Sequence, residues 1–501
     1  MPSLSFNAPR PCLGRAGLAA ALAVLSACAG LGSTGFVDDG GEFLPLGVPA
    51  GDQTNPALAI NAEGGYAVWQ ENSGAAGTYT IRARRLNRAL TGWYRSFVVN
   101  SAVEGSHEEP QVVQLSDGGA AFFWRGGPVG KQGIYGRFLR PGGGNTANFL
   151  GDDLEINAAG RGQNQNISAT ALKDGSVLVT WANYGDDGSG FGVFAQRLSS
   201  TGEKIGGKFQ VNSTTASNQR SPSVTAMPDG GFTIAWVSEG QRSNPSRDIL
   251  CDVYARVFGP SAKATTGEMR LNQGLNLAAT PSVTATADGG FVAAWAERDH
   301  DVAANGWDIM AGSFNRDGVA IKPNVRLNTY LKSDQLAPRL AAVNGSVMAT
   351  WSSMGQDGSR EGVFARSFSP TLELLDEEFG VNQTTISQQK DPVVAADSTG
   401  RVLAVWTSFN SLESGFDLVA RKFAAPASIA KLSCDIVKTA DGVKLSWATE
   451  PGRTYQVQRS TDASNWDGAD KSDRLADGTS DSMVFPITTA SGTFFRVVRI
   501  P

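Results

Sequence analysis

Hydrophobic and polar residues alternate in short runs along most of the chain, and these runs follow a repeating order. The stretch Pro222–Trp236 shows the order: an alternating run, then Pro-Asp-Gly-Gly, then a second run that ends in tryptophan. Alternation with a period of two is typical of a half-buried β-strand, and a glycine-containing turn between two such runs is typical of a hairpin. The pattern therefore predicts strand, tight turn, strand.

This hairpin recurs seven times. The tryptophans that end its second strand are 55, 57, 55, 59, 56 and 55 residues apart, at Trp69, Trp124, Trp181, Trp236, Trp295, Trp351 and Trp406. A nearly fixed period of this length indicates a repeat architecture. A glycine stands in the turn of every copy, which suits a turn position that needs positive φ.

Two further strands complete each repeat. The third resembles Val253–Phe258, and the fourth ends in an aliphatic residue followed by asparagine, at Asn100, Asn157, Asn212, Asn272, Asn328 and Asn382. Four antiparallel strands per unit, repeated around an axis, predict the blades of a β-propeller. An open solenoid of the same units is the alternative.

The fourth-strand pattern follows a third strand only six times. The seventh third strand, Leu418–Phe423, runs into a linker rich in proline and alanine. The missing strand is predicted at the other end of the chain, because Gly41–Leu46 matches the start of the fourth-strand pattern Gly-Glu-x-x-Val-Asn. We expect it to complete blade seven, which closes the ring without a covalent bond and removes free sheet edges.

The predicted fold class is all-β: a seven-bladed β-propeller followed by a small β-sandwich domain. The predicted boundaries are a signal segment at 1–27, a flexible tether rich in Gly, Ser and Asp at 28–40, the propeller at 41–423, a linker at 424–430 and the small domain at 431–501.

The amino terminus has the pattern of an export signal. Arg10 and Arg15 precede an apolar run at 16–24 that is too short to span a bilayer. Leu25-Ser-Ala-Cys28 resembles the bacterial lipobox, which implies that Cys28 is lipidated and anchors the protein to a membrane of the cell envelope, with the outer membrane expected. The alternative is an ordinary signal peptide cleaved near Ala27 or Ala29.

The repeats also carry a resemblance. Gln356–Arg366, the following Val-Asn, and Asp-Gly-Gly-Phe-x-x-x-Trp are similar to a tandem repeat of exported bacterial proteins. This resemblance implies an exported or surface protein and no defined reaction. Thr454–Trp466 and Phe494–Val497 resemble a fibronectin-type-III-like end domain of secreted bacterial proteins.

The composition of the chain argues against some classes of partner and cofactor. Lys plus Arg total 43 and Asp plus Glu total 48, a net charge of −5, which argues against a nucleic-acid partner. Two histidines leave little room for histidine chemistry, and the sequence contains no His-Glu-x-x-His, Gly-x-Ser-x-Gly or Cys-x-x-Cys. We expect no cofactor, with calcium the one option, because the acidic loops at 186–189, 299–301 and 356–359 suit it but lack a full ligand set.

One basic residue repeats. Arginine occupies the same third-strand position in five blades, at Arg84, Arg137, Arg256, Arg366 and Arg421. Propeller sialidases hold a substrate carboxylate with an arginine cluster, but those arginines come from non-equivalent positions. The repetition therefore predicts packing between blades.

The candidate site lies where the repeat stops repeating. From tryptophan to third strand the loop spans 10 to 12 residues in five blades, but 17 in blade four and 14 in blade five. The two long loops carry mixed charges and an extra tryptophan, which suit a sugar or peptide ligand: Glu239, Arg242, Arg247, Asp248, Glu297, Arg298, Asp299, His300, Asp301, Trp307 and Asp308. The alternative is that these surface insertions carry no function.

Three functions remain open. The leading hypothesis is a lipid-anchored binding protein of the cell envelope that presents a propeller face to a glycan or another envelope protein. The second is a glycan-active enzyme, a glycosidase or lyase, that uses Glu297 with Asp299 or Asp301 as paired carboxylates. The third is a scaffold with no small ligand.

Overall fold

The computed structural model describes the chain in two compact units. In the unit at 33–428 it describes residues 35–47, 49, 51–72, 78–92, 95–102, 104–128, 130–143, 145–158, 163–242, 250–299, 306–411 and 415–425. In the unit that contains 429–501 it describes residues 434–439, 442–449, 454–460, 467–468, 474–485 and 494–500.

The first unit consists of seven four-stranded antiparallel sheets. Blade one contains β2 Asp52–Asn61, β3 Gly64–Asn72, β4 Thr80–Leu86 and β5 Phe97–Val98. Blade two contains β6 Ser106–Gln114, β7 Ala120–Gly127, β8 Gly133–Leu139, the short 3-10 helix η1 Thr146–Asn148, and β9 Leu154–Asn157. Blade three contains β10 Asn164–Ala171, β11 Val177–Tyr184, β12 Phe191–Leu198 and β13 Lys204–Gln210.

The remaining blades repeat this order. Blade four contains β14 Gln219–Ala226, β15 Phe232–Glu239, β16 Cys251–Phe258 and β17 Met269–Arg270. Blade five contains β18 Leu277–Ala285, β19 Phe291–Arg298, β20 Asp308–Phe314 and β21 Val325–Arg326. Blade six contains β22 Gln335–Val343, β23 Ser346–Met354, β24 Glu361–Phe368 and β25 Phe379–Gly380. Blade seven contains β26 Gln389–Ala396, β27 Arg401–Ser411, β28 Gly415–Ala424 and, from the other end of the chain, β1 Val37–Asp38.

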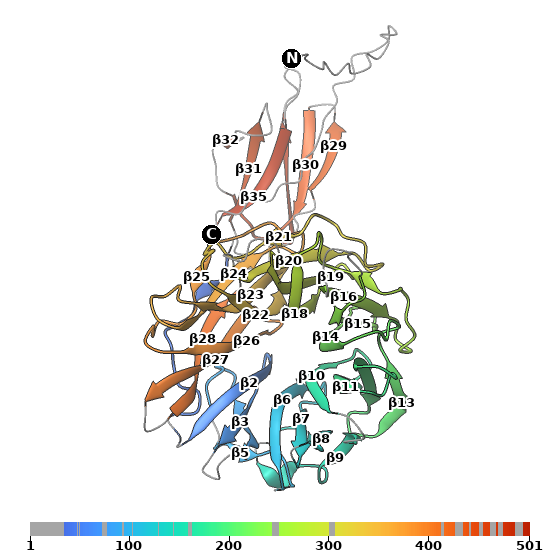
Figure 1. Cartoon of the computed structure of the whole chain (residues 1–501). Coiled ribbons are helices and arrows are strands. Elements are labelled where there is room, and N and C mark those ends of the chain that lie inside the picture. The colour runs from blue at the N-terminus through green and yellow to red at the C-terminus, as the bar shows by residue number, and fades with distance from the viewer. Residues whose placement is uncertain are drawn as a thin grey trace. The chain divides into compact units, whose positions relative to one another are not determined.

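The sheets form a closed ring (Figure 1). The first strand of each blade contacts the first strand of the next, and β26 of blade seven contacts β2 of blade one. The first strands therefore surround the axis, and the unit is a seven-bladed β-propeller, as the repeats predict.

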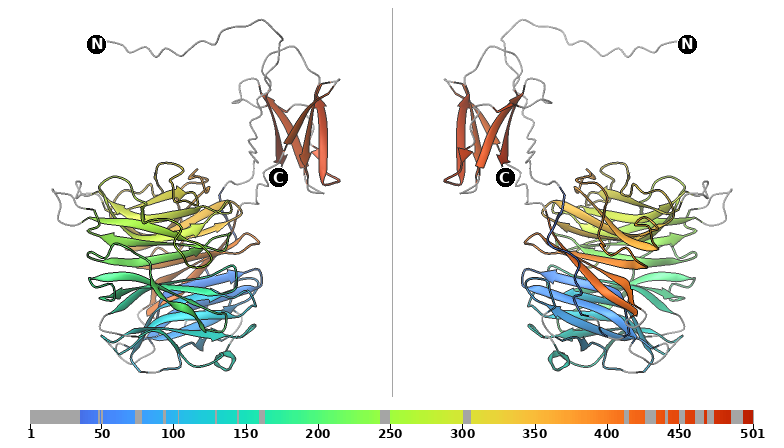
Figure 2. Two further views of the ribbon diagram at one scale, coloured as in Figure 1. Left: turned by 90° about the vertical axis from the view of Figure 1, so that its right-hand side faces the viewer. Right: turned by 90° about the vertical axis from the view of Figure 1, so that its left-hand side faces the viewer.

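Blade seven is completed by the N-terminal segment, which lies along the last strands in the right-hand view of Figure 2. Val37 and Asp38 pair with Ala424 and Phe423, and Phe43 forms a bridge to Ala420. The strand thus begins earlier than 41–46, within the segment predicted as a tether. The same two-part geometry occurs in blade four, where the bridge of Ala264 to Phe258 precedes the pairing of Met269 by five residues, and the sequence pattern marks only the second part.

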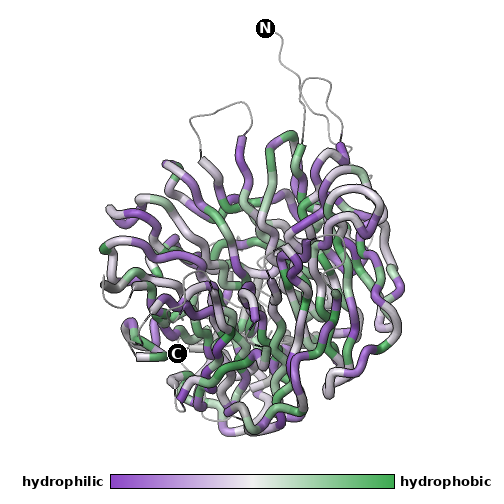
Figure 3. Tube along the Cα trace, turned by 60° about the horizontal axis from the view of Figure 1, so that its bottom comes forward, coloured by the Kyte–Doolittle hydropathy of each residue, from purple (hydrophilic) through white to green (hydrophobic). Residues whose placement is uncertain are grey.

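Large side chains fill the space between blades. All seven repeat tryptophans are at most 1% exposed, and they lie among aliphatic and aromatic residues of the adjacent blade. Hydrophobic and hydrophilic residues alternate along many strands (Figure 3), as expected for strands with faces in different surroundings. The tryptophans are therefore residues of the fold.

The repeated arginines also join blades. Arg256 Nη1 donates to the carbonyl of Val211 at 3.0 Å, and Arg366 Nη1 donates to that of Leu327 at 3.0 Å; each acceptor directly follows the fourth strand of the preceding blade. Arg137 and Arg421 make the equivalent bonds to the carbonyls of Val99 and Val381. The prediction that the repeated arginines pack between blades is confirmed for these four.

A carboxylate near the start of the fourth strand makes a further contact, which we name the clamp carboxylate. Glu268 accepts from the amide of Thr214 at 3.1 Å and its hydroxyl at 2.7 Å, so it holds the chain that leaves the preceding blade. Asp153, Glu378 and Glu42 make the equivalent bonds in blades two, six and seven. Glu42 of the closing segment therefore makes the same contact as the clamp carboxylate of a regular fourth strand.

The second unit contains two sheets. One consists of β29 Cys434–Thr439, β30 Gly442–Ala448 and β34 Ser480–Phe485, and the other of β31 Thr454–Ser460, β32 Asp467–Gly468, β33 Arg474–Leu475 and β35 Phe494–Ile500. Leu445 and Trp447 from the first sheet and Tyr455, Val457 and Val497 from the second share one core. This unit is the small β-sandwich expected from the sequence. Across both units, no helix in the described residues has the length and apolar character needed to cross a membrane.

Candidate functional site

In each blade the loops from the second to the third strand and the loops that enter the next blade share one end of the sheet, because the strands alternate in direction. We name this side of the propeller the loop face. The hydroxyl of Ser359, in the second-to-third loop of blade six, donates to the carbonyl of Ser387, in the loop that enters blade seven, at 3.2 Å. The predicted ligand-binding residues that the structure describes belong to this face.

Two of them, Glu239 and Arg242, are occupied by the framework of blade four. Glu239 accepts from Asn218 at 2.7 Å and from Arg220 at 2.7 Å. Arg242 makes two bonds, of 2.6 and 2.7 Å, to the fully buried carboxylate of Asp252. These side chains hold the loop in place, since breaking either set would leave a buried polar group unpaired.

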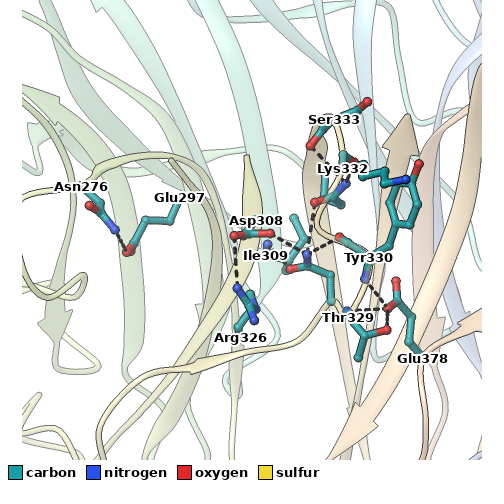
Figure 4. Close-up of polar contacts among 12 residues, drawn as sticks. Asn276, Glu297, Asp308, Ile309, Arg326, Thr329, Tyr330, Lys332, Ser333 and Glu378 are labelled. Carbon is teal, nitrogen blue, oxygen red and sulfur yellow. Dashed lines mark hydrogen bonds and ion pairs between the residues drawn. The ribbon is translucent and has the colours of Figure 1, made fainter. Parts of the chain in front are cut away.

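The predicted residues of blade five are also engaged (Figure 4). Glu297 accepts from the indole of Trp295 at 2.8 Å and from Asn276 at 3.0 Å. Burial raises the pKa of Glu297, and these two hydrogen bonds oppose that rise. Asp308 accepts from Asn328 at 2.7 Å, and Asn328 in turn accepts from the amide of Ile309. Both acids therefore support the blade.

The other predicted residues do not complete a site. Trp307 is half-buried and packs against the core between blades five and six, and Arg298 and Asp299 have interactions of their own. Arg247, Asp248, His300 and Asp301 lie outside the described residues, as does Cys28. The predicted residues that the structure describes are thus engaged in separate contacts within the blades and do not form one site.

The acidic loops suggested for calcium are engaged as well. Asp186 pairs with Lys208 at 2.6 Å, and Asp357 accepts from the amide of Ser359 and from Asn382. Among the described residues, no three or more His, Cys, Asp or Glu side chains come together in a way that could hold a metal ion.

A different feature repeats at the centre of the ring. The first strand of every blade contains a β-bulge whose residue has φ between 49° and 56°, although none is glycine: Asn55, Glu109, Asn166, Ser221, Thr280, Ala337 and Asp391. Non-glycine residues rarely adopt this conformation, and such strain is concentrated at functional or over-determined positions. We name these seven positions the bulge ring.

Two residues of the bulge ring are acidic. In blade two, Glu109 accepts from the amide of Asn166, the bulge residue of blade three, at 2.5 Å, and lies 3.5 Å from Arg125. Burial raises the pKa of Glu109, while Arg125 and the Asn166 amide act in the opposite direction. Glu109 is therefore a link between two adjacent blades.

The other acid, Asp391 of blade seven, has different surroundings. Among the described residues, its half-buried carboxylate accepts no hydrogen bond. Burial raises the pKa of Asp391, and the charges of Lys390 and Arg339 oppose the rise, while Glu361 adds to it. Asp391 thus has a raised pKa, and its carboxyl group makes no hydrogen bond to the described residues of the fold.

Its basic neighbour, Arg339, lies on β22 of blade six. The Arg339 side chain is exposed, yet burial among protein atoms lowers its pKa. Both are expected of a group on a first strand that faces water at the axis of the ring. Its guanidinium donates to the carbonyl of Pro338 at 3.0 Å, which leaves most of its five donors available.

Two further charged groups complete the cluster. Lys390 lies over the ring of Phe416 at 4.9 Å, and Glu361 begins β24 with one carboxylate oxygen that is buried and, within the described chain, unpaired. Buried polar atoms are usually hydrogen-bonded, so such an atom requires an explanation. We name Arg339, Glu361, Lys390 and Asp391 the axial cluster; it is the candidate site.

Sequence reasoning missed this cluster because it searched the loops for departures from the repeat and left the first strands uncompared. The signal exists: at the bulge position, which precedes proline in six blades, Asp391 stands where five other blades have Asn, Ser, Thr or Ala and blade two has Glu109. Two positions beyond the bulge, blade six has Arg339, whereas the other blades have Ala, Gln, Ser or Val.

No family model matches this chain, and no curated protein matches it. Among solved structures it is similar to a protein of unknown function from Dyadobacter fermentans, at 12% identity and a TM-score of 0.48, over 66% of this chain and 97% of that one. It is also similar to an alpha-L-arabinanase from Penicillium chrysogenum, at 11% identity and a TM-score of 0.44, over 78% of this chain and 96% of that one.

A third solved structure is an ulvan lyase of polysaccharide lyase family PL25, at 11% identity and a TM-score of 0.46, over 77% of this chain and 94% of that one. The structure of the arabinanase contains bound arabinobiose, and that of the lyase contains bound -[GlcA(1-4)Rha3S]-.

Proposed function

We propose that the protein is a glycan-active propeller whose site is the axial cluster, with Asp391 as the proton donor. The observation that carries the proposal is the state of Asp391: a half-buried carboxyl with a raised pKa and, in the described chain, no hydrogen bond to the framework. Burial favours the protonated form of Asp391, which is the form that a general acid needs in order to protonate the leaving-group oxygen of a glycosidic bond.

The neighbours of Asp391 supply the remaining roles. Glu361 is the candidate second carboxylate, which either activates water or attacks the sugar directly. Arg339 offers exposed guanidinium donors for sugar hydroxyl or carboxylate oxygens. Proton transfer from Asp391 and charge stabilisation by Glu361 are thus assigned to separate groups.

The test is turnover and binding measured on the same variants. The mature protein is incubated with a panel of neutral and acidic polysaccharides, and release of reducing or unsaturated ends is followed. Asp391→Asn is expected to lower turnover by a factor of about 100 or more, which is the contribution expected of a general acid. Binding of the same glycan is expected to change less than threefold. Glu297→Gln is the matched control, because Glu297 is a framework acid, and it should retain turnover in the folded fraction.

Each outcome decides between functions. Binding without turnover by the wild type would contradict catalysis and support the binding protein that the sequence favours, with Arg339→Ala expected to weaken it. Turnover that survives Asp391→Asn would place the site elsewhere. Neither binding nor turnover, together with a specific protein captured from envelope extracts, would support the scaffold.

We also propose that the protein is a lipoprotein of the cell envelope, supported by the lipobox-like residues before Cys28. Cys28→Ser is expected to remove the protein from the membrane fraction and to lower the mass of the processed chain by that of the lipid. An unchanged mass and unchanged fractionation would contradict lipidation.

A further inference from the structure

Blade seven differs from the other blades in one position of its third strand. The repeat tryptophan of each blade is paired in register with a residue of the third strand, and in six blades that residue is large: Arg82, Tyr135, Phe194, Tyr254, Met310 and Phe364. In blade seven, Trp406 is paired with Val419. The large side chain that stands opposite the tryptophan in the other blades is therefore replaced here by a smaller one, although Trp406 itself is buried.

A pocket of about 430 Å³ lies at this place. It is lined by Ser408, Phe409 and Val419 of blade seven, by Phe43 and Leu44 of the closing segment, and by Ile386 of the loop that enters the blade. Ile386 is 79% exposed and Leu44 is 37% exposed. Apolar walls that reach water around a hollow are typical of a binding site.

The other blades show what fits such a space. In blade two, Tyr135 stacks on Trp124 with ring centroids 6.4 Å apart and an angle of 19° between the rings. In blade four, Tyr254 stacks on Trp236 at 6.5 Å and 24°. A phenol ring is thus the group that the fold itself places at this position in two blades.

The hydroxyl ends of these tyrosines lie near carboxylates. After burial, Glu155 and the clamp carboxylate Asp153 raise the pKa of Tyr135, and Glu155 is also its hydrogen-bond partner. After burial, Asp252 raises the pKa of Tyr254, Arg270 and Arg242 oppose the rise, and the clamp carboxylate Glu268 makes a smaller contribution to it. The clamp carboxylate of blade seven, Glu42, lines the pocket.

We propose that this pocket, which we name the seam pocket, binds a phenol ring, with the ring over Val419 and the hydroxyl donating to Glu42. The ligand replaces the tyrosine side chain that the repeat omits in blade seven. The chemistry is shared by a tyrosyl side chain of a partner protein and by a small free phenol. The site is separate from the axial cluster, since Arg339, Glu361, Lys390 and Asp391 do not line it.

The experiment uses the full-length mature protein with p-cresol, toluene and N-acetyl-L-tyrosinamide as probes, and binding is followed by calorimetry and by NMR of the probe. Saturable binding of p-cresol is expected, at least tenfold tighter than that of toluene because only p-cresol can donate to Glu42. Tighter binding of N-acetyl-L-tyrosinamide than of p-cresol indicates a tyrosyl partner, and the reverse order indicates a free phenol.

The decisive variant is Val419→Tyr, which restores the ring of the other blades. It is expected to abolish p-cresol binding and to raise the unfolding temperature, so that lost binding is not a consequence of misfolding. Met310→Tyr places the same side chain at the equivalent position of blade five and should leave binding unchanged. Absence of saturable p-cresol binding to the wild type, or equal binding to Val419→Tyr, would overturn the proposal.

Discussion

Glu109 in blade two and Asp391 in blade seven occupy the same position of the repeat, but their carboxylates are used differently. Both are left-handed bulge residues, with φ of 55° and 52°, and burial raises the pKa of both. Glu109 accepts a hydrogen bond from the amide of Asn166 and lies beside Arg125. Asp391 accepts none in the described chain and lies in range of Arg339, Lys390 and Glu361.

This difference shows that a raised pKa alone does not imply a functional role. Structural acids and catalytic acids both show perturbed pKa values, so the shift alone does not identify a site. Asp391 differs because burial disfavours its charged form and no hydrogen bond from the described residues offsets that effect. In a ring of seven equivalent positions, such a residue is better explained by a ligand than by the fold.

The largest expected effect comes from removing the framework acid. Glu109→Ala leaves the Asn166 amide and Arg125 without their partner, and we expect a loss of about 2–3 kcal/mol in the free energy of unfolding. Asp391→Ala, the matched change in blade seven, should lie within about 0.5 kcal/mol of the wild type. Urea unfolding followed by tryptophan fluorescence measures both. Equal losses would remove the distinction between the two acids.

A clamp carboxylate provides the next comparison, because its pKa moves the other way. Burial acts to raise the pKa of Glu268, but the hydrogen bonds from Thr214, Ser213 and Gln241 outweigh it and the net pKa is lowered. The ionised form is therefore favoured in the folded state. Its stabilisation is complete above the unfolded pKa, about 4.3, and is lost as pH falls through the folded value.

We expect Glu268→Gln to lower the free energy of unfolding by about 1–2 kcal/mol at pH 7. The loss should shrink on acidification below about pH 4, where the wild-type carboxylate is protonated as well. Unfolding at a series of pH values tests the sign, and a loss that grows toward low pH would contradict it.

Much of the fold follows from sequence because it depends on local pattern. Seven tryptophans at a nearly constant spacing and glycines at each turn specify the hairpins, and the same patterns mark third and fourth strands that the structure contains at those residues. The closing strand was placed a few residues late because Val37–Asp38 carries no part of the repeated pattern. Its pairing with β28 depends on a contact across the whole chain, which local pattern does not report.

The candidate site followed from sequence much less well. Charge in a long loop suggested function at Glu239, Arg242 and Glu297, but hydrogen bonds within the blades engage all three. Whether a carboxylate has a partner depends on three-dimensional neighbours that alternation and spacing do not encode. The positive φ of the bulge ring is equally hard to predict, since four of its seven residues, Glu109, Ser221, Thr280 and Ala337, are of types that rarely adopt a left-handed conformation.

A smaller effect tests the strain of the bulge ring itself. Thr280 is β-branched at φ 49°, and its hydroxyl is buried without a partner in the described chain. Thr280→Gly is expected to raise the free energy of unfolding by about 0.5–1 kcal/mol, because glycine adopts this conformation without steric cost. Thr284→Gly, at a position of β18 without positive φ, should lower it. A loss at Thr280 as large as at Thr284 would show that the bulge is not strained.

The smallest effect concerns Asp391 and has a defined sign. Because burial raises the pKa of Asp391, the charged form is disfavoured in the folded state, and its cost is complete above the folded pKa and absent below the unfolded value of about 3.9. Asp391→Asn removes the charge and should raise the free energy of unfolding at pH 7 by up to about 0.5 kcal/mol, a modest gain because the carboxylate is only partly buried. The gain should vanish as pH falls to about 3.9, where Asp391 is protonated in both states. A variant that is less stable at pH 7 would show that the Asp391 carboxylate serves the fold, as Glu109 does, and would leave the axial cluster without its proton donor.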